Sequence, residues 1–472
     1  MMERLLILML MCFGMCSCAS VVDNRNGQPP NFVLILADDQ AWNGTSVEME
    51  PGMKESASDF HQTPFLEKLA SQGIRFSNAR AAAPVCAPSR YSIQFGKSPA
   101  RLRLIRVGMD ASHIPHAEWQ SIAKVLRSVD STYVAAHFGK WGMGASPEIL
   151  GYEVSDGATR NMDGGFVNDK SQWETTMTRD PKKVLELTDR ATAFLDSCAA
   201  NSRPFYLQVS HYAVHSNIQT SDSSFAIMNS LPLGDRHRHV GFAGMTLDLD
   251  QSLGKILDKL EELGMSDDTY VIYMSDNGGV PNIPGAKKYE QSLNHPLQRG
   301  KWDAMEGGLR IPMVVAGPGI LPGSHSNAHV WGADLLPTIA DLANGLALLP
   351  DSLDGGSMKP VLQGEKEVEV TRSVNGMAFH VPYRNKIALN RPHSAWISGN
   401  HKLLYFHDDG EVRLFDLAHD CGETQNLATA LPARAEAMKK SLLSYLDEVN
   451  APRWQEGITW KGNPFSTYQS TH

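Results

Sequence analysis

Residues Asn31-Phe-Val-Leu-Ile-Leu-Ala37 form an unbroken apolar run, and the pair Asp38-Asp39 follows it directly. An unbroken apolar run of this length is typical of a central strand covered on both faces, as in a parallel sheet between layers of helices. Similar runs recur at residues 132–136, 204–209, 269–274 and 311–316. The sequence therefore predicts a sheet built largely from buried, parallel strands.

Segments between these runs have the spacing of amphipathic helices. Residues 63–70 begin with Thr63, a candidate N-cap, and place Pro64 at the first helical position. Leucine and isoleucine recur at helical spacing through residues 246–263, and Gly264 ends that pattern. This alternation predicts an α/β fold over residues 31–374, with a large, mixed but mostly parallel central sheet flanked by helices.

A second region is predicted at residues 375–472. Short strand-like runs at 395–398, 402–406 and 411–415 are separated by turn residues at 399–400 and 408–410, which is typical of antiparallel hairpins. A helical pattern follows at residues 432–449. We expect a smaller C-terminal α+β subdomain that carries an antiparallel sheet.

The N-terminus has the pattern of an export signal over residues 1–18. Arg4 precedes an apolar run at residues 5–15, which is too short to span a bilayer. The Ser17-Cys18 pair resembles a bacterial lipobox, which predicts lipidation of Cys18, with Cys16 as the alternative and a simple cleaved signal as the other interpretation. Residues 19–30 read as a tether. We expect an exported protein, either periplasmic or an outer-membrane lipoprotein of a Gram-negative bacterium.

Composition narrows the function classes. The chain has 472 residues, of which 42% are hydrophobic and 20% charged, so it is long and apolar enough for a large core and is not disordered. Its formal net charge of −9 argues against non-specific nucleic-acid binding. Six cysteines in so long a chain do not form a disulfide scaffold. Cys198 and Cys421 fall in different predicted subdomains, and we expect free thiols rather than a pair.

Acidic and amide side chains follow two of the predicted strands. Asp38 and Asp39 end the first strand, and Asp276 and Asn277 end the strand at residues 269–274. Because open α/β sheets keep their sites at strand ends, these oxygen donors predict a Ca²⁺ or Mg²⁺ site. The alternative is that each acidic pair caps a helix.

One short segment carries a specific signature, Pro84-Val85-Cys86-Ala87-Pro88-Ser89-Arg90. A single cysteine in a proline-containing loop is ordinarily a buried structural thiol. The pattern Cys-x-Pro-Ser-Arg, however, resembles the signature of the type I sulfatase family, in which this cysteine is oxidised to Cα-formylglycine. Further segments resemble blocks of the same family in the same order: residues 63–66 with 73–76, 139–141, 204–215, 275–279, 299–312, 334–338 and 414–417.

The resemblance implies an alkaline-phosphatase-like fold and hydrolysis of sulfate monoesters. Cys86, once converted to 3-oxoalanine (formylglycine) and hydrated, would attack the sulfur with one hydroxyl and expel sulfate with the other. Calcium, or alternatively magnesium, would activate this nucleophile and draw in the sulfate oxygens. The ligands that the resemblance implies are Asp38, Asp39, Asp276, Asn277 and the modified Cys86.

Five further residues take roles from the same resemblance. Arg90 would hold the modified side chain, and Lys140 and Lys301 would bind the non-bridging sulfate oxygens. His215 would protonate the leaving alcohol. His211, four residues earlier, either lines the substrate pocket or is a core histidine that satisfies a backbone partner.

The sequence departs from the family at one position. The Gly-Lys-Trp block of the family is usually followed by a histidine that assists sulfate release, whereas Gly142 stands here. Either another group, such as His137 or His113, supplies that proton transfer, or the step proceeds with less assistance.

No single motif indicates the substrate class, which is inferred from the range of the family and from the expected export. The family acts on carbohydrate, aryl and steroid sulfates, and for an exported bacterial protein we expect sulfated glycans: glycosaminoglycan, mucin or algal fragments. A formylglycine-generating maturase is an expected partner. The basic segment 235–239 either binds further acidic groups of the glycan or is a solvated loop. Two other functions stay open: a phosphonate or phosphate monoester hydrolase with the same nucleophile, and a non-catalytic lipoprotein that binds sulfated glycans.

Overall fold

The computed structural model describes residues 29–169, 174–283, 292–365, 368–385 and 389–459. The predicted signal segment 1–18, with Cys18, and most of the predicted tether 19–30 lie outside the described residues. No helix in the described ranges is both long enough and apolar enough to cross a membrane.

Strand β1 (Asn31–Ala37) is an inner strand of an eight-stranded sheet, and all seven of its residues are buried. It pairs in parallel with β9 (Thr269–Ser275) on one side and with β7 (Phe205–Ser210) on the other. Its side chains alternate between two hydrophobic clusters, one on each face of the sheet. The apolar run is unbroken because both faces of this strand are covered, as predicted.

The sheet is mixed but mostly parallel, as predicted. Its strands are, in order, β11 (Ser324–Ser326), β2 (Ile74–Phe76), β10 (Met313–Ala316), β9, β1, β7, β4 (Val134–Gly139) and β5 (Val154–Ser155). Among these eight strands, β10 alone runs antiparallel to its neighbours. The parallel strands β9, β1, β7 and β4 consequently place their carboxyl ends along one edge.

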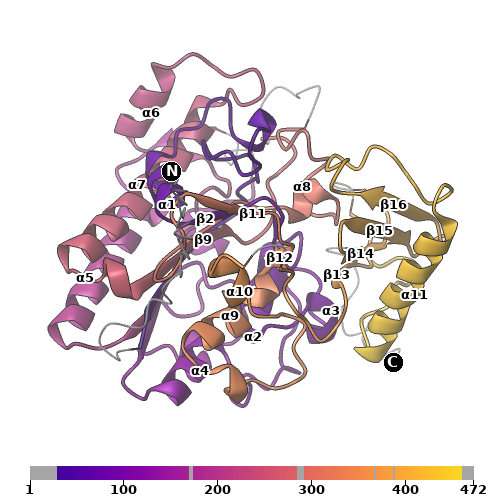
Figure 1. Cartoon of the computed structure of the whole chain (residues 1–472). Coiled ribbons are helices and arrows are strands. Elements are labelled where there is room, and N and C mark those ends of the chain that lie inside the picture. Colours follow the sequence, from indigo (N-terminus) through magenta and orange to yellow (C-terminus); the bar gives the residue numbers. More distant parts are fainter. Residues whose placement is uncertain (1–28, 170–173, 284–291, 366–367, 386–388, 460–472) are drawn as a thin grey trace, which may run out of the picture.

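Helices cover both faces of the sheet (Figure 1). The cluster on one face includes residues of α1 (Pro64–Gln72), α5 (Val184–Ala200) and α7 (Val240–Glu262). The cluster on the other face includes residues of α2 (Cys86–Phe95), α4 (Ile122–Val129) and α9 (Leu335–Leu342). This is the layered α/β architecture that the alternating pattern predicts.

The structure corrects three local predictions: the cap of α1, the bounds of β4 and the start of α7. Helix α1 begins at Pro64 as predicted, but Thr63 forms no side-chain cap. Instead, Asp250 of α7 accepts hydrogen bonds from the backbone N–H groups of Phe65 and Leu66 at 2.9 and 2.8 Å. Strand β4 begins and ends later than the predicted segment 132–136.

Helix α7 begins at Val240 rather than at residue 246. Its first turns contain two glycines, which weaken any helix signal in the sequence. Both are needed for close packing, because a Cβ at Gly241 would lie 2.2 Å from Thr175 Oγ1 and one at Gly244 would lie 2.4 Å from Thr220 Oγ1. The helix start is capped by His239, whose ring accepts a hydrogen bond from the Phe242 N–H at 3.1 Å.

The C-terminal region forms a four-stranded antiparallel sheet covered by one helix, as predicted (Figure 1). Its strands in order are β13 (Met377–Val381), β14 (His393–Ser398), β15 (His401–Phe406) and β16 (Val412–Asp416), and α11 (Pro432–Glu448) packs on them. The sequence did not reveal β13, because a long connection rather than a tight turn joins it to β14.

The remaining strands and α-helices of the described chain are β3 (Ala79–Arg80), β6 (Thr176–Met177), β8 (Gln219–Thr220), β12 (Val330–Trp331), α3 (Pro99–Leu102), α6 (Asp222–Asn229), α8 (Glu306–Leu309) and α10 (Lys359–Leu362), and short 3₁₀ turns lie between them. Cys198 is buried, Cys421 is half-buried, and both are free thiols in the part of the chain that the structure describes.

Candidate active site

Three carboxylates meet at the carboxyl edge of the sheet. Ala37 and Ser275 are register partners at the ends of β1 and β9, so Asp38 and Asp276 leave the sheet side by side. Asp39 turns back with φ of 64°, and its N–H donates to Asp276 Oδ1 at 3.2 Å. Oxygens of Asp38, Asp39 and Asp276 lie within 4.8 Å of one another. The pairing of parallel strands therefore builds the cluster that the sequence predicts.

The donor set fits a hard divalent cation. Asp38 Oδ1 and Asn277 Oδ1 are buried and have no hydrogen-bond partner among the described residues. The Asn277 amide nitrogen donates to Asp39 Oδ1 at 2.8 Å, which leaves its carbonyl oxygen as the donor for an ion. Carboxylate and amide oxygens are the preferred ligands of Ca²⁺ and Mg²⁺. Among the described helices, none begins at Asp38-Asp39 or at Asp276-Asn277, so the alternative interpretation as helix caps is wrong.

Each carboxylate also has its own cation. Lys140 Nζ lies 2.6 Å from Asp38 Oδ2, and Lys301 Nζ lies 2.7 Å from Asp39. The third carboxylate pairs with Arg90, whose Nε donates to Asp276 Oδ2 at 2.9 Å and whose guanidinium also hydrogen-bonds the Lys140 carbonyl. All six side chains are buried. With these three pairs, the carboxylates can bind an incoming metal cation, and the lysine and arginine side chains can bind an incoming anion.

Burial and charge set the protonation of the two adjacent aspartates in opposite directions. Burial raises the pKa of Asp38 to about 7, although Lys140 opposes the rise. Burial also acts to raise the pKa of Asp39, but the charges of Lys301 and His215 outweigh it and hold this pKa below its usual range. The cluster thus resists full ionisation unless further positive charge is present.

Cys86 is the first residue of α2 and is 5% exposed. Its N-cap, Val85, offers no side-chain partner to the first turn of the helix. Cys86 is one of the groups whose charge raises the pKa values of Arg90, Lys140 and Lys301. The cysteine of the signature is therefore within electrostatic range of the three cations, and it lies at a helix N-terminus, where a negative charge is favoured.

His215 lies against the same cluster. Its Nε2 is 3.7 Å from Asp39 Oδ2 and 3.5 Å from the amide nitrogen of Asn161, and its Nδ1 is 2.6 Å from the Ser216 carbonyl. Because a carbonyl only accepts, Nδ1 carries a hydrogen. Burial lowers the pKa of His215 to about 3, with Asp39 opposing the shift.

Gly142 also faces the site. A Cβ at this position would lie 3.1 Å from Arg90 Cδ and 3.8 Å from Lys140 Cε. Neither suggested substitute is shown in contact with Cys86 in the described chain. His137 is buried in β4 with Nε2 3.0 Å from Ser210 Oγ, and His113 Nε2 is 2.9 Å from the Leu102 carbonyl.

His211 has the surroundings of a core histidine. It is fully buried, and its Nε2 lies 3.3 Å from Ser252 Oγ on α7. Burial lowers the pKa of His211 to about 3. The geometry favours the core interpretation over pocket lining, although the partner is the side-chain hydroxyl of Ser252 and not the expected backbone group.

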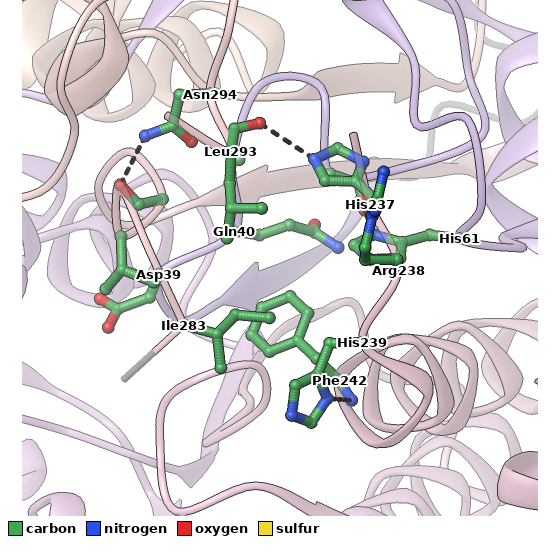
Figure 2. Close-up of a pocket in the computed structure, with 14 residues that line it drawn as sticks. Asp39, Gln40, His61, His237, Arg238, His239, Phe242, Ile283, Leu293 and Asn294 are labelled. Carbon is green, nitrogen blue, oxygen red and sulfur yellow. Dashed lines mark hydrogen bonds between the residues drawn. The ribbon is translucent and has the colours of Figure 1, made fainter. Parts of the chain in front are cut away.

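The basic segment 235–239 is only partly solvated, because some of its side chains are buried and others are exposed. The ring of His237 is buried, stacks on His61 at 4.7 Å and lies 3.0 Å from the Leu293 carbonyl. Figure 2 shows the pocket that this segment shares with Asp39, where the amide of Gln40 points inward. Arg238 is the exposed cation at its rim.

Two residues near the site carried no sequence signal. Asn161 lies in a short turn with no motif, yet its amide approaches His215, and its Oδ1 is buried without a hydrogen-bond partner in the described chain. Lys182 is buried near the carboxylates, although a lysine before a helix is ordinarily solvated.

Comparison with known proteins identifies the family. A family model described as Sulfatase matches residues 30–346, and one described as N-sulphoglucosamine sulphohydrolase, C-terminal, matches residues 301–451.

Individual relatives agree with these models. A sulfatase of Formosa agariphila is 25% identical over 90% of each chain, and the N-acetylgalactosamine-6-sulfatase of Mus musculus is 27% identical over 70% of this chain and 68% of its own. The solved structure of Ps i-CgsB in complex with k-i-k-neocarrahexaose shares the fold, with a TM-score of 0.72 and 23% identity over 90% of this chain and 95% of its own. The chain therefore belongs to the sulfatase family and is a sulfuric ester hydrolase.

Proposed function

We propose that this sulfatase hydrolyses sulfate monoesters of carbohydrates, using a formylglycine made from Cys86 and a bound calcium ion. The observation that carries the proposal is the convergence of Cys86, three paired carboxylates and the three cations that pair with them at one sheet edge. A relative named N-acetylgalactosamine-6-sulfatase and a similar fold that holds k-i-k-neocarrahexaose support a carbohydrate substrate. Glycosaminoglycan, mucin and algal fragments belong to this class.

The proposal adds two groups to the described residues, a divalent metal ion and a hydrated formylglycine. Asp38, Asp39, Asp276 and Asn277 would hold calcium, or magnesium, and such an ion neutralises sulfate oxygens and lowers the pKa of a nucleophile beside it. The hydrated formylglycine at position 86 supplies one hydroxyl that bonds to sulfur and a second whose loss of a proton lets sulfate leave.

Lys140 and Lys301 bind the sulfate group. In the present geometry each ammonium lies on a carboxylate, 2.6 Å from Asp38 and 2.7 Å from Asp39. A divalent cation held by those carboxylates would compensate their negative charge, which would leave the two ammonium groups available to the non-bridging sulfate oxygens. Arg90 stays on Asp276 and orients that carboxylate beside the nucleophile.

His215 delivers the proton to the leaving alcohol. The Ser216 carbonyl fixes the hydrogen on Nδ1, so Nε2 is the ring atom that faces the site. Burial lowers the pKa of His215 to about 3 in the absence of substrate. The negative charge of a bound sulfate ester favours the imidazolium, so protonation of Nε2 accompanies substrate binding and readies the ring to act as an acid.

Export and maturation complete the proposal. The sequence pattern of residues 1–18 supports secretion, and lipidation of Cys18 would hold the enzyme in the periplasm or at the outer membrane of a Gram-negative cell. A formylglycine-generating maturase is the partner that converts Cys86 before or during export.

The test is sulfate release by the full-length protein, co-produced with a maturase and supplied with calcium. We expect release from a panel of sulfated mono- and disaccharides, none from Cys86→Ala, and slower turnover of the matched phosphate esters. Faster hydrolysis of the phosphate esters would assign the protein to the phosphonate and phosphate hydrolases. Saccharide binding that survives in Cys86→Ala, with no turnover by the matured wild type, would instead support a glycan-binding lipoprotein.

A further inference from the structure

Lys182 is a buried lysine at the same sheet edge as the carboxylate cluster. It lies in the 3₁₀ turn Pro181–Lys183 that leads into α5, and 1% of its surface is exposed. Helix α5 connects the parallel strands β4 and β7 and therefore runs antiparallel to them. Its first turn consequently lies at the carboxyl ends of the strands, where Lys140 and Asp38 also lie.

The ammonium of Lys182 forms no hydrogen bond and no ion pair within the described ranges, whereas its backbone N–H donates to Gln219 Oε1 at 3.0 Å. Lys140, Lys301 and Arg90 each pair with one carboxylate of the site. In the described part of the site, Lys182 is thus the cation left without a carboxylate of its own. A buried charge with no partner is unfavourable, which calls for a ligand that supplies one.

The electrostatic neighbours of Lys182 belong to the site. Burial lowers its pKa to about 7, Asp38 and Asp39 oppose this shift, and the charge of Lys140 adds to it. Lys182 is therefore within electrostatic range of two carboxylates of the cluster and of one sulfate-binding lysine.

The backbone directs the Lys182 side chain inward through a conformation that is unfavourable for a non-glycine residue. Lys182 and Lys183 are consecutive non-glycine residues in the left-handed region, with φ of 53° and 55°. The turn places Lys182 in the interior, while the Lys183 side chain is 47% exposed and lies 3.8 Å from Glu186. Unfavourable backbone conformations of this kind gather at ligand sites.

We propose that Lys182 is a third lysine of the anion-binding site and binds a sulfate oxygen of the substrate beside Lys140. The proposal rests on the proposed function, because it takes the bound anion to be the sulfate group under hydrolysis. That anion provides the partner that the buried ammonium lacks. It also adds a second charge-assisted hydrogen bond on the Lys140 side of the sulfate.

The test compares Lys182→Met with Lys183→Met in the full-length, calcium-loaded protein. The two residues share side chain, backbone conformation and position before α5, but Lys183 points to solvent. The probe is inorganic sulfate: thermal unfolding is followed over a sodium sulfate titration, with sodium chloride at equal ionic strength as the reference. We expect the wild type and Lys183→Met to gain the same sulfate-dependent stability.

For Lys182→Met we expect the apparent Kd for sulfate to rise at least about tenfold, and the KM for a sulfate ester to rise with it. The stability of this variant without sulfate should not fall, because the substitution removes an unpaired buried charge. Lys182→Arg, which keeps the charge, should regain part of the sulfate affinity.

Unchanged sulfate affinity in Lys182→Met, together with lower stability in the absence of sulfate, would overturn the proposal in favour of a purely structural lysine. Sulfate binding by Lys182 can be judged independently of whether the protein hydrolyses sulfate esters. Sulfate binding that depends on Lys182 in a protein that hydrolyses no sulfate ester would leave the anion site standing while the proposed function failed.

Discussion

At the scale of residues, the site is a set of matched charges. Asp38, Asp39 and Asp276 are each paired with a single cation, and the oxygens of the three lie within 4.8 Å of one another. Three carboxylates so close repel one another, and burial strengthens that repulsion. The arrangement is therefore suited to gaining a divalent cation and an oxyanion together.

His215→Ala tests the proton donor. We expect kcat for a sugar sulfate to fall by about 10²–10⁴-fold, because the alcohol then leaves without a proton. The loss should be much smaller for an aryl sulfate with a low-pKa phenol, which needs less help to leave. Steady-state kinetics on both substrates measure this, with the 85% exposed His419→Ala as the control. Equal losses on the two substrates would contradict the role.

Asp38 makes the metal-free protein sensitive to pH. Burial raises its pKa from 3.8 to about 7, so the folded protein holds this proton more tightly than the unfolded chain. The associated stability is present below about pH 4 and is lost as the pH rises through about 7. With a chelator present, we expect the thermal midpoint of the wild type to fall over this window relative to Asp38→Asn. Calcium should restore the wild type far more than the variant, and parallel pH profiles would refute the assignment.

Sequence alone anticipated most of these residues, by two routes. The carboxylates follow buried strands, where the chemistry of a strand end limits the residue type, whereas Cys86 and the two lysines were found through their resemblance to family motifs. Asn161 and Lys182 lie in turns, and only the folded chain shows that Asn161 approaches His215 and that Lys182 is buried within electrostatic range of Asp38 and Asp39. Gly142 was visible as a departure, but the structure was needed to show that it faces Arg90.

At the scale of elements, strand ends and helix starts place the chemistry. β1 and β9 end in register and project Asp38 and Asp276 together, while α2 starts at Cys86. The apolar runs predicted such strands well, because burial on both faces leaves a strong signal. Helix boundaries were harder: the cap of α1 comes from Asp250, far away in sequence, and the glycine-containing start of α7 has little helical signal.

The cap supplied by Asp250 gives an element-scale prediction. Asp250→Ala removes the acceptor for the N–H groups of Phe65 and Leu66, and we expect a loss of about 1–2 kcal/mol in the free energy of unfolding. Denaturant unfolding of the calcium-loaded protein measures it. Asp258→Ala, on the exposed side of the same helix with a side chain that is 61% exposed, should change stability by less than about 0.5 kcal/mol. Similar effects from both substitutions would exclude the capping role.

At the scale of the whole molecule, buried ion pairs join the C-terminal sheet to the catalytic region. Glu306, in the first turn of α8, pairs with Arg80 at 2.7 Å and with Lys402 of β15 at 3.0 Å. Lys402 also lies 2.8 Å from Glu423. Since α8 follows Lys301 closely in sequence, this network ties the sheet to the segment that carries one of the site lysines. The sequence indicated this block only as a resemblance and gave no pairing.

Lys402→Met should therefore lower the free energy of unfolding by much more than the loss of an exposed lysine side chain would. It leaves two buried carboxylates short of a partner, and we expect a loss of about 3–5 kcal/mol in unfolding free energy. Lys439→Met, in an i,i+3 pair on the surface of α11, is the control and should cost less than about 1 kcal/mol. A loss of that small size for Lys402→Met would show that the network does not join the two regions.

Conversion of Cys86 to the nucleophile of a sulfatase would be seen at once in the chemical state of that residue. The full-length protein is co-produced with an active formylglycine-generating maturase, digested, and treated with an aldehyde-specific and a thiol-specific reagent before mass spectrometry. We expect the peptide containing Cys86 to take up the aldehyde reagent. A peptide that takes up only the thiol reagent, although the same maturase converts a control substrate, would exclude formylglycine at position 86 and the proposed sulfatase mechanism with it.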